Sequence, residues 1–118
     1  KESCDSGVCG VCTVLLGDKA VKSCLIPVGK VVEEEITTIE GLENDKGLNT
    51  VQKAFKEFNA AQCGYCTSGI IVSLTSLFKK NKNPSNDEIN ASLSEHLCRC
   101  GSHNSINKAI IKIKSDLN

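Results

Sequence analysis

The eight cysteines constrain this chain more than any other feature, because they fall into two groups with defined spacing. The first cysteine group has the spacing C-x4-C-x2-C followed by one distal cysteine, and it consists of Cys4, Cys9, Cys12 and Cys24. The second cysteine group combines a CxxC pair with a CxC pair, and it consists of Cys63, Cys66, Cys98 and Cys100. Thiols this numerous hold metal or form disulfides, and their spacing distinguishes the two uses.

The first cysteine group has the spacing of the plant-type [2Fe–2S] ferredoxins. Four thiolates must converge on two irons while backbone N–H groups approach the sulfides, so the connecting loop needs residues without bulky side chains. Gly7 and Gly10 meet that need. The two short knuckles of a structural zinc site are absent here. The spacing therefore predicts an iron–sulfur cluster on this group.

The second cysteine group leaves zinc and iron–sulfur open, because CxxC and CxC pairs also bind structural zinc tetrahedrally. Cys66 stands just before a predicted helix, whose free N–H groups and positive dipole end favour an anionic cluster. We expect Cys98 at the C-terminal end of one helix and Cys100 just before another. The first group tips the balance towards iron–sulfur. Disulfides are a third interpretation, but nothing in the chain indicates secretion.

Two histidines, His96 and His103, flank the CRC motif. Four thiolates already complete the site. We therefore expect both histidines to be surface residues near the cluster and not ligands.

Charge and composition exclude two other classes of protein. The chain has 14 Lys plus Arg against 14 Asp plus Glu, so it lacks the basic excess that non-specific binding to nucleic acid requires. It also lacks an apolar run long enough to span a membrane. Thiolate-bound clusters suit a reducing compartment, so we expect a water-soluble, cytoplasmic protein.

Residues 1–43 favour strands and loops. Thr13–Leu16 and Lys19–Lys22 flank Gly17-Asp18, which predicts a hairpin because glycine supplies the positive φ of a tight turn. The β-branched residues of 36–39 predict a third strand.

Residues 44–118 begin with a polar boundary at 44–49 and continue with four amphipathic helices. Ser85 and Glu88 form a predicted capping box at the start of the third helix, whose apolar face we expect to include Leu97. The apolar positions of the four helices are Val51, Ala54, Phe55 and Phe58; Ile70, Ile71, Leu74, Leu77 and Phe78; Ile89, Leu93 and Leu97; and Ile106, Ala109, Ile110, Ile113 and Leu117.

In this order, the motifs resemble the small [2Fe–2S] iron–sulfur subunit of the molybdenum hydroxylases, the xanthine dehydrogenase, aldehyde oxidoreductase and carbon monoxide dehydrogenase family. The matching words are KESCDSGVCGVCTVLL, SCL at Cys24, ITTIEGL at 36–42, AAQCGYCTSGII at 60–71, NPSNDEI at 83–89 and LCRCG at 97–101. The resemblance runs from about Lys1 to Ile113.

The resemblance implies an α+β protein of two domains. Residues 1–43 would be the C-terminal part of a plant-type ferredoxin-like β-grasp domain, and residues 44–118 an all-α four-helix [2Fe–2S]-binding domain. The chain begins at Lys1 and contains no Met. We expect the remaining strands of the grasp to be disordered, cut away or supplied by a separate peptide.

The resemblance also implies a role in electron transfer, without catalysis by this chain itself. Cys4, Cys9, Cys12 and Cys24 would hold one [2Fe–2S] cluster, and Cys63, Cys66, Cys98 and Cys100 a second. The second would lie beside a molybdenum–pterin cofactor on a large partner subunit, where Gln62 and Cys100 match the residues that contact the pterin. Electrons would leave through the first cluster to FAD on another subunit or to another acceptor.

One departure from the family concerns the acceptor. Gly101-Ser102-His103 replaces the common Thr-Gly-Tyr and resembles the branch that oxidises isoquinoline- or nicotinate-type heterocycles, where some members use a cytochrome in place of a flavin subunit. Two rival functions also stay open at this point. They are a zinc-stapled interaction module and a free-standing ferredoxin-like carrier.

Overall fold

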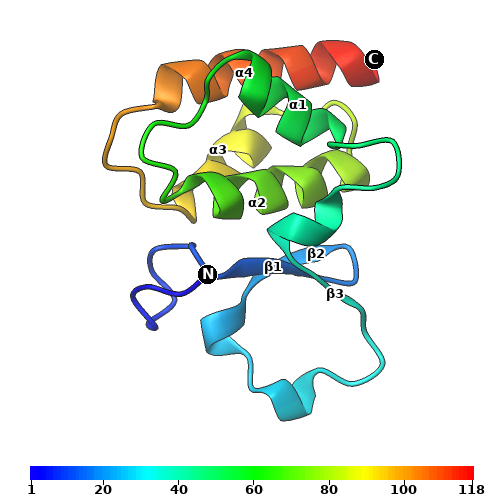
Figure 1. The fold of residues 1–118 in the computed structure, drawn as a ribbon, viewed down its shortest axis with the longest axis vertical. Helices are drawn as coiled ribbons and strands as arrows, with labels where there is room; N and C mark the ends of the chain where they lie inside the picture. The colour runs from blue at the N-terminus through cyan, green and yellow to red at the C-terminus, as the bar shows by residue number, and fades with distance from the viewer.

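The computed structural model describes residues 1–118 as a small sheet followed by four helices (Figure 1). The strands β1 (Thr13–Leu16), β2 (Lys19–Lys22) and β3 (Ile36–Thr37) form one antiparallel sheet in the order β2-β1-β3. The 3-10 helices are η1 (Ser23–Leu25), η2 (Val28–Lys30) and η3 (Ile39–Leu42). The helices are α1 (Thr50–Glu57), α2 (Thr67–Lys80), α3 (Asn86–Ser94) and α4 (His103–Leu117). The predicted combination of a strand-rich first part and four helices is confirmed.

The sheet confirms the predicted hairpin and shortens the predicted third strand. β1 and β2 pair with Thr13 opposite Lys22 and Leu16 opposite Lys19, and Gly17 takes the left-handed backbone (φ 59°) that the turn needs. β3 contributes only two residues to the sheet. The prediction of a strand through Ile39 is wrong, because Ile39 begins η3 and packs against the helical core.

The start of α3 confirms the capping box, whereas its end differs from the prediction. The backbone N–H of Glu88 donates to the Ser85 hydroxyl at 3.2 Å, and the Glu88 carboxylate accepts from the Ser85 N–H at 2.8 Å. The helix ends at Ser94, so Leu97 does not extend its apolar face and is 54% exposed. The physical reason is a competing partner: the Leu97 N–H donates to the carbonyl of Cys9 at 3.0 Å.

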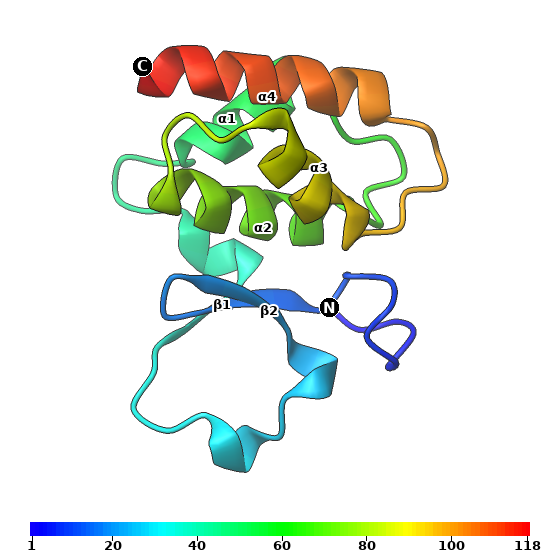
Figure 2. The same ribbon diagram turned by 180° about the vertical axis from the view of Figure 1, so that it is seen from behind.

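The core of the molecule lies around α2, which is the middle layer between the sheet and the pair α1 and α4 (Figures 1 and 2). Seven of its residues in succession, Gly69 to Thr75, are buried, because the helix is covered on both sides. The helices share one cluster of 14 buried residues, which includes Leu74, Ile106 and Ile113. The predicted inward faces of α2 and α4 are therefore confirmed.

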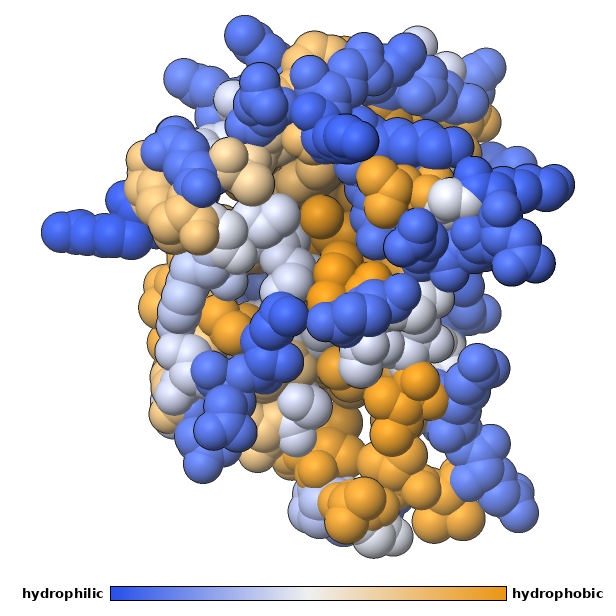
Figure 3. Space-filling view, in the orientation of Figure 1, coloured by the Kyte–Doolittle hydropathy of each residue, from blue (hydrophilic) through white to orange (hydrophobic).

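The loop between β2 and β3 carries much of the exposed apolar surface. Figure 3 shows apolar side chains gathered at the end of the molecule where this loop lies. Leu25, Val28 and Val32 are the large exposed hydrophobic residues of the loop. No helix of the structure has the length and apolar character that a membrane crossing requires.

Candidate metal centres

The two cysteine groups lie at one end of the molecule. Both ribbon views show the loop before β1, the α1–α2 connection and the α3–α4 connection at this same end (Figures 1 and 2). All eight cysteines are free thiols, so the disulfide interpretation finds no support. The expected position of Cys66 just before a helix is confirmed, because Cys66 is the N-cap residue of α2.

In the first cysteine group, backbone N–H groups point at sulfur atoms. The N–H of Cys9 donates to the sulfur of Cys4 at 3.4 Å, and the N–H of Cys24 donates to the sulfur of Cys12 at 3.5 Å. Cys9 and Cys12 are buried, Cys24 is half-buried and Cys4 is exposed. Donors directed at sulfur favour the thiolate, which is the form that binds metal.

The pKa values in the first group diverge. A hydrogen bond from the Ser6 hydroxyl, with help from the Cys9 N–H, lowers the pKa of Cys4 to about 5. Desolvation and the adjacent Cys12 thiol raise the pKa of Cys24. Thiolates this close repel one another, so they ionise together only when a cation neutralises them. The group fits a metal-bound state better than four free thiolates.

The second cysteine group comes from two separate helix junctions. Cys66 caps the N-terminus of α2, is only 5% exposed and belongs to the helical core. Cys98 is half-buried, and its sulfur lies 3.3 Å from the hydroxyl of Ser102. The expectation that Cys98 ends a helix is wrong, because α3 stops at Ser94 and an irregular segment carries Cys98. Cys63 and Cys100 are exposed.

The second group is arranged as two pairs of thiols. Hydrogen bonding from the Cys100 thiol lowers the pKa of Cys63. Burial, reinforced by the neighbouring Cys98, raises the pKa of Cys66 to about 12. The Ser102 hydroxyl lowers the pKa of Cys98 to about 6. The pairs are thus Cys63 with Cys100 and Cys66 with Cys98.

Four thiols in two pairs match the ligands that a two-iron cluster takes from a protein. In a [2Fe–2S] centre each iron takes two protein ligands, whereas structural zinc takes four ligands around a single ion. The donor set and its pairing therefore fit a [2Fe–2S] cluster.

Direct hydrogen bonds join the surroundings of the two groups. The carbonyl of Cys9 accepts from the N–H of Leu97, the residue before Cys98, at 3.0 Å. The hydroxyls of Ser3 and Tyr65 are hydrogen-bonded, and Tyr65 lies between the two cysteines of the CxxC pair. A covalent and hydrogen-bonded path therefore runs from one group to the other.

His96 departs most clearly from its prediction. The expectation of a surface position is wrong, because the residue is only 7% exposed and its Nε2 lies 2.7 Å from the Ser73 hydroxyl of α2. Burial lowers the pKa of His96, although the nearby backbone of Gly10 opposes the shift. His103 is exposed at the start of α4, as predicted. The one sequence signal of the His96 site is Gly10, whose lack of a side chain serves the histidine ring as well as the cluster loop.

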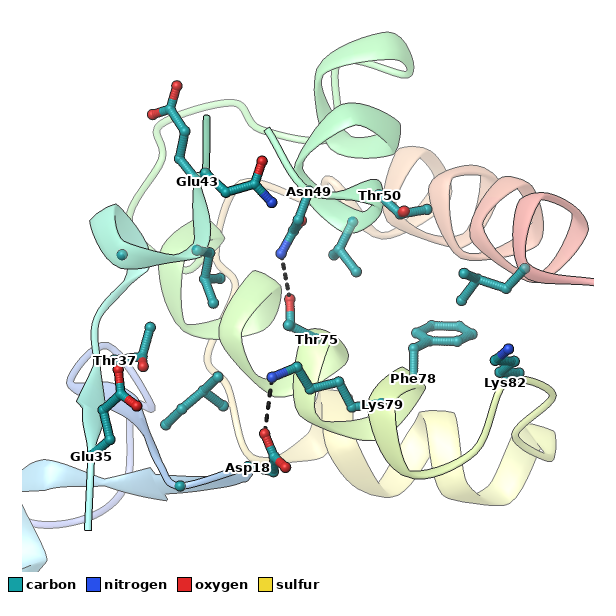
Figure 4. Close-up of a pocket in the computed structure, with 17 residues that line it drawn as sticks. Asp18, Glu35, Thr37, Glu43, Asn49, Thr50, Thr75, Phe78, Lys79 and Lys82 are labelled. Carbon is teal, nitrogen blue, oxygen red and sulfur yellow. Dashed lines mark hydrogen bonds and ion pairs between the residues drawn. The ribbon is translucent and has the colours of Figure 1, made fainter. Parts of the chain in front are cut away.

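Gln62 and Cys100 are both exposed in the loops of the second group. A cavity of about 790 Å³ lies elsewhere, between the sheet and the helices (Figure 4). Its walls are held by the ion pair of Lys79 with Asp18 at 2.9 Å and by the Asn49–Thr75 hydrogen bond at 3.3 Å. No cysteine lines this cavity, so the candidate chemistry stays with the cysteine groups.

Comparison with known proteins agrees with this geometry. Residues 38–111 match the family model of the [2Fe-2S] binding domain. One component of the nicotinate dehydrogenase of Pseudomonas putida is 42% identical over 110 residues, which cover 93% of this chain and 70% of that protein.

Two solved structures extend the likeness over the first cysteine group. Quinoline 2-oxidoreductase from Pseudomonas putida 86 superposes with a TM-score of 0.87 at 35% identity, covering 99% of this chain and 74% of that one. Aldehyde oxidoreductase from Desulfovibrio desulfuricans gives a TM-score of 0.89 at 35% identity and covers 99% of this chain and 13% of that one. The likeness therefore includes both groups of thiols.

Proposed function

We infer the role of this chain from its family: it belongs to the [2Fe–2S] binding domain family, among the small iron–sulfur subunits of the molybdenum hydroxylases. It is accordingly the electron-transfer subunit of an oxidoreductase, and the substrate chemistry belongs to a partner.

Each cysteine group holds one [2Fe–2S] cluster in this proposal. Cys4, Cys9, Cys12 and Cys24 bind the first, and Cys63, Cys66, Cys98 and Cys100 bind the second. When bound, each cluster takes up and releases one electron at a time. The observation that carries the proposal is the location of two sets of four free thiols at one end of the fold, linked by the Cys9–Leu97 hydrogen bond.

The surroundings of the thiols serve the clusters in two ways. Backbone N–H groups that point at sulfur offset negative charge in the first group. The buried position of Cys66 in the helical core excludes water from one side of the second group. Both effects are established means of adjusting a cluster's reduction potential.

We place the molybdenum-binding partner next to the second group. Its exposed residues Gln62 and Cys100 would contact the pterin of the molybdenum cofactor on the large subunit. A cavity of about 310 Å³, lined in part by Tyr65, Leu97 and Arg99, opens beside the other three cysteines of the group, Cys63, Cys66 and Cys98. The accessibility of this face supports the assignment.

The substrate class of the holoenzyme is proposed to be a nitrogen heterocycle. Gly101-Ser102-His103 supports this choice, as do the names of two similar proteins, which are a nicotinate dehydrogenase component and a quinoline oxidoreductase. Electrons would leave from the first group to an FAD-binding subunit or to a cytochrome.

We further propose that residues 1–43 are the C-terminal part of a β-grasp domain and that residues 44–118 form the second domain. The short three-stranded sheet and the exposed apolar loop beside it support additional strands from elsewhere. Binding of clusters by thiolates supports a cytoplasmic location.

The proposal is tested on the complex with its large subunit. Reduction by nicotinate under anaerobic conditions should produce two distinct electron paramagnetic resonance signals. The Cys24→Ser variant should keep the signal of the second group but lose electron delivery to an artificial acceptor. A colourless protein that contains zinc would establish the interaction module instead. Failure of any large subunit to co-purify would establish the free-standing carrier.

A further inference from the structure

His96 is a buried side chain that the assigned ligands leave unexplained. Its ring is 7% exposed, and Nε2 is anchored by the Ser73 hydroxyl of α2 at 2.7 Å. Its other nitrogen, Nδ1, is buried beside the Gly10 backbone but has no partner in hydrogen-bonding geometry. A buried polar atom without a partner costs stability, so this position needs a compensating reason.

Nδ1 of His96 faces Gly10 and Gly69, and neither position has space for a larger residue. A side chain at Gly10 would collide with the His96 ring, and one at Gly69 would reach to 2.9 Å from Nδ1 while pressing on the Gly10 carbonyl. Gly10 lies between Cys9 and Cys12 of the first group. Gly69 begins the buried stretch of α2 that follows Cys66. The imidazole therefore stands where the two groups approach each other.

The residues on either side of His96 bond to the hairpin and to the loop of the first cysteine group. The Glu95 carboxylate pairs at 2.6 Å with the ammonium of Lys22, which donates to the Gly7 carbonyl at 2.8 Å. The Leu97 N–H donates to the Cys9 carbonyl at 3.0 Å. Three consecutive residues thus connect to the loop of the first group, and His96 fills the space between that loop and α2.

We propose that His96 is a positioning residue that fixes the separation and orientation of the two cysteine groups. The proposal rests on the function assigned above. A planar ring held by Ser73 at one nitrogen and packed between two glycine backbones is a rigid spacer, because packed protein interiors do not deform continuously. The ring then keeps the N–H of Leu97 within hydrogen-bonding distance of the carbonyl of Cys9.

The test uses the intact complex, fully reduced with dithionite, and measures the magnetic interaction between the two reduced clusters. This interaction falls steeply with separation and does not depend on turnover. His96→Ala should retain iron and sulfide but lose most of the splitting that this interaction produces in the electron paramagnetic resonance spectrum. It should also slow reduction of the first cluster by about tenfold. His96→Gln, which can still reach Ser73, should recover part of both. His103→Ala is the matched control, because that histidine is exposed.

Reduced splitting in His96→Ala with wild-type splitting in His103→Ala supports the proposal. Unchanged splitting in His96→Ala overturns it. If His96→Ala loses iron, Ser73→Ala is the second variant, because it removes only the hydroxyl that holds the His96 ring. Ser73→Ala should lower the splitting less strongly than His96→Ala. Unchanged splitting in Ser73→Ala overturns the proposal. A wild-type complex without two cluster signals would refute the assigned function itself, which keeps the two failures distinct.

Discussion

The two cysteine groups solve the same chemical problem with different parts of the fold. The first is a loop whose backbone N–H groups point at sulfur and whose nearest support is a sheet of short strands. The second is fastened to helices: Cys66 belongs to the core cluster, and Cys98 packs against it. The first site depends on hydrogen bonds and on its neighbour, whereas two thiols of the second, Cys66 and Cys98, are held by the packing of apolar side chains.

Because of this difference, substitutions should affect the two cysteine groups unequally. The second group should survive loss of the first, because its helices share a continuous core of their own. The first group should be sensitive to changes at the junction, because residues 95–97 supply much of its tertiary contact. Substitutions at either site test this difference, and the largest effects are expected at the ligands themselves.

Loss of one ligand from each group should separate the two sites most strongly. Cys24→Ser should remove about half of the iron and sulfide and leave the second-group signal intact, because the helical core does not need the hairpin thiol. Cys66→Ser should remove the second-group signal and also lower the thermal midpoint, because a hydroxyl replaces a core thiol. Iron analysis with electron paramagnetic resonance measures both. Complete loss of iron in Cys24→Ser would break the comparison.

A core truncation should distinguish the helices from the sheet. Leu74 in α2 is fully buried, so Leu74→Ala should lower the free energy of unfolding by about 2–5 kcal/mol. Ile36 in β3 is 52% exposed, so Ile36→Ala should change it by no more than about 0.5 kcal/mol. Urea unfolding followed by circular dichroism measures both. Equal costs would mean that Ile36, at the edge of the sheet, is packed as tightly as Leu74.

The capping box of α3 should contribute less than the core. Ser85→Ala leaves the Glu88 N–H without its acceptor and should cost about 1 kcal/mol. Ser115→Ala, at an exposed position within α4, is the control and should be close to neutral. The difference between the two urea midpoints gives the value. A neutral Ser85→Ala would show that tertiary packing alone fixes the start of α3.

The smallest effect concerns pH. The Ser85 N–H, with its hydroxyl, lowers the pKa of Glu88 in the folded protein. A lowered folded pKa gives stability that is present above the unfolded value of about 4.3 and is lost as pH falls through the folded value. The stability difference between wild type and Glu88→Gln should therefore stay constant from about pH 8 to about 5.5. A difference that already shrinks within that range would contradict this assignment.

Local patterns in the sequence are sufficient to predict the hairpin and the four helices. Apolar spacing places Leu74 and Ile106 in the core, and Ser85 with Glu88 locates the start of α3. Each of these features depends on neighbours within a few positions along the chain. Periodicity and capping chemistry report such neighbours directly.

The features that local patterns predict wrongly depend on distant partners. Leu97 leaves the helical pattern because its N–H bonds to Cys9, and His96 is buried because Gly10, Gly69 and Ser73 form its surroundings. Ile39 leaves the strand because it packs against the helical core. These partners come from other elements of the fold, so no local pattern could indicate them.

The number of clusters on the chain is measured by iron, acid-labile sulfide and zinc analysis of the purified protein, together with electron paramagnetic resonance after dithionite reduction. Two [2Fe–2S] clusters predict about four irons and four sulfides per chain, with two distinct reduced signals. Zinc in place of iron, or a single signal with half that iron, would contradict the account of two four-cysteine sites.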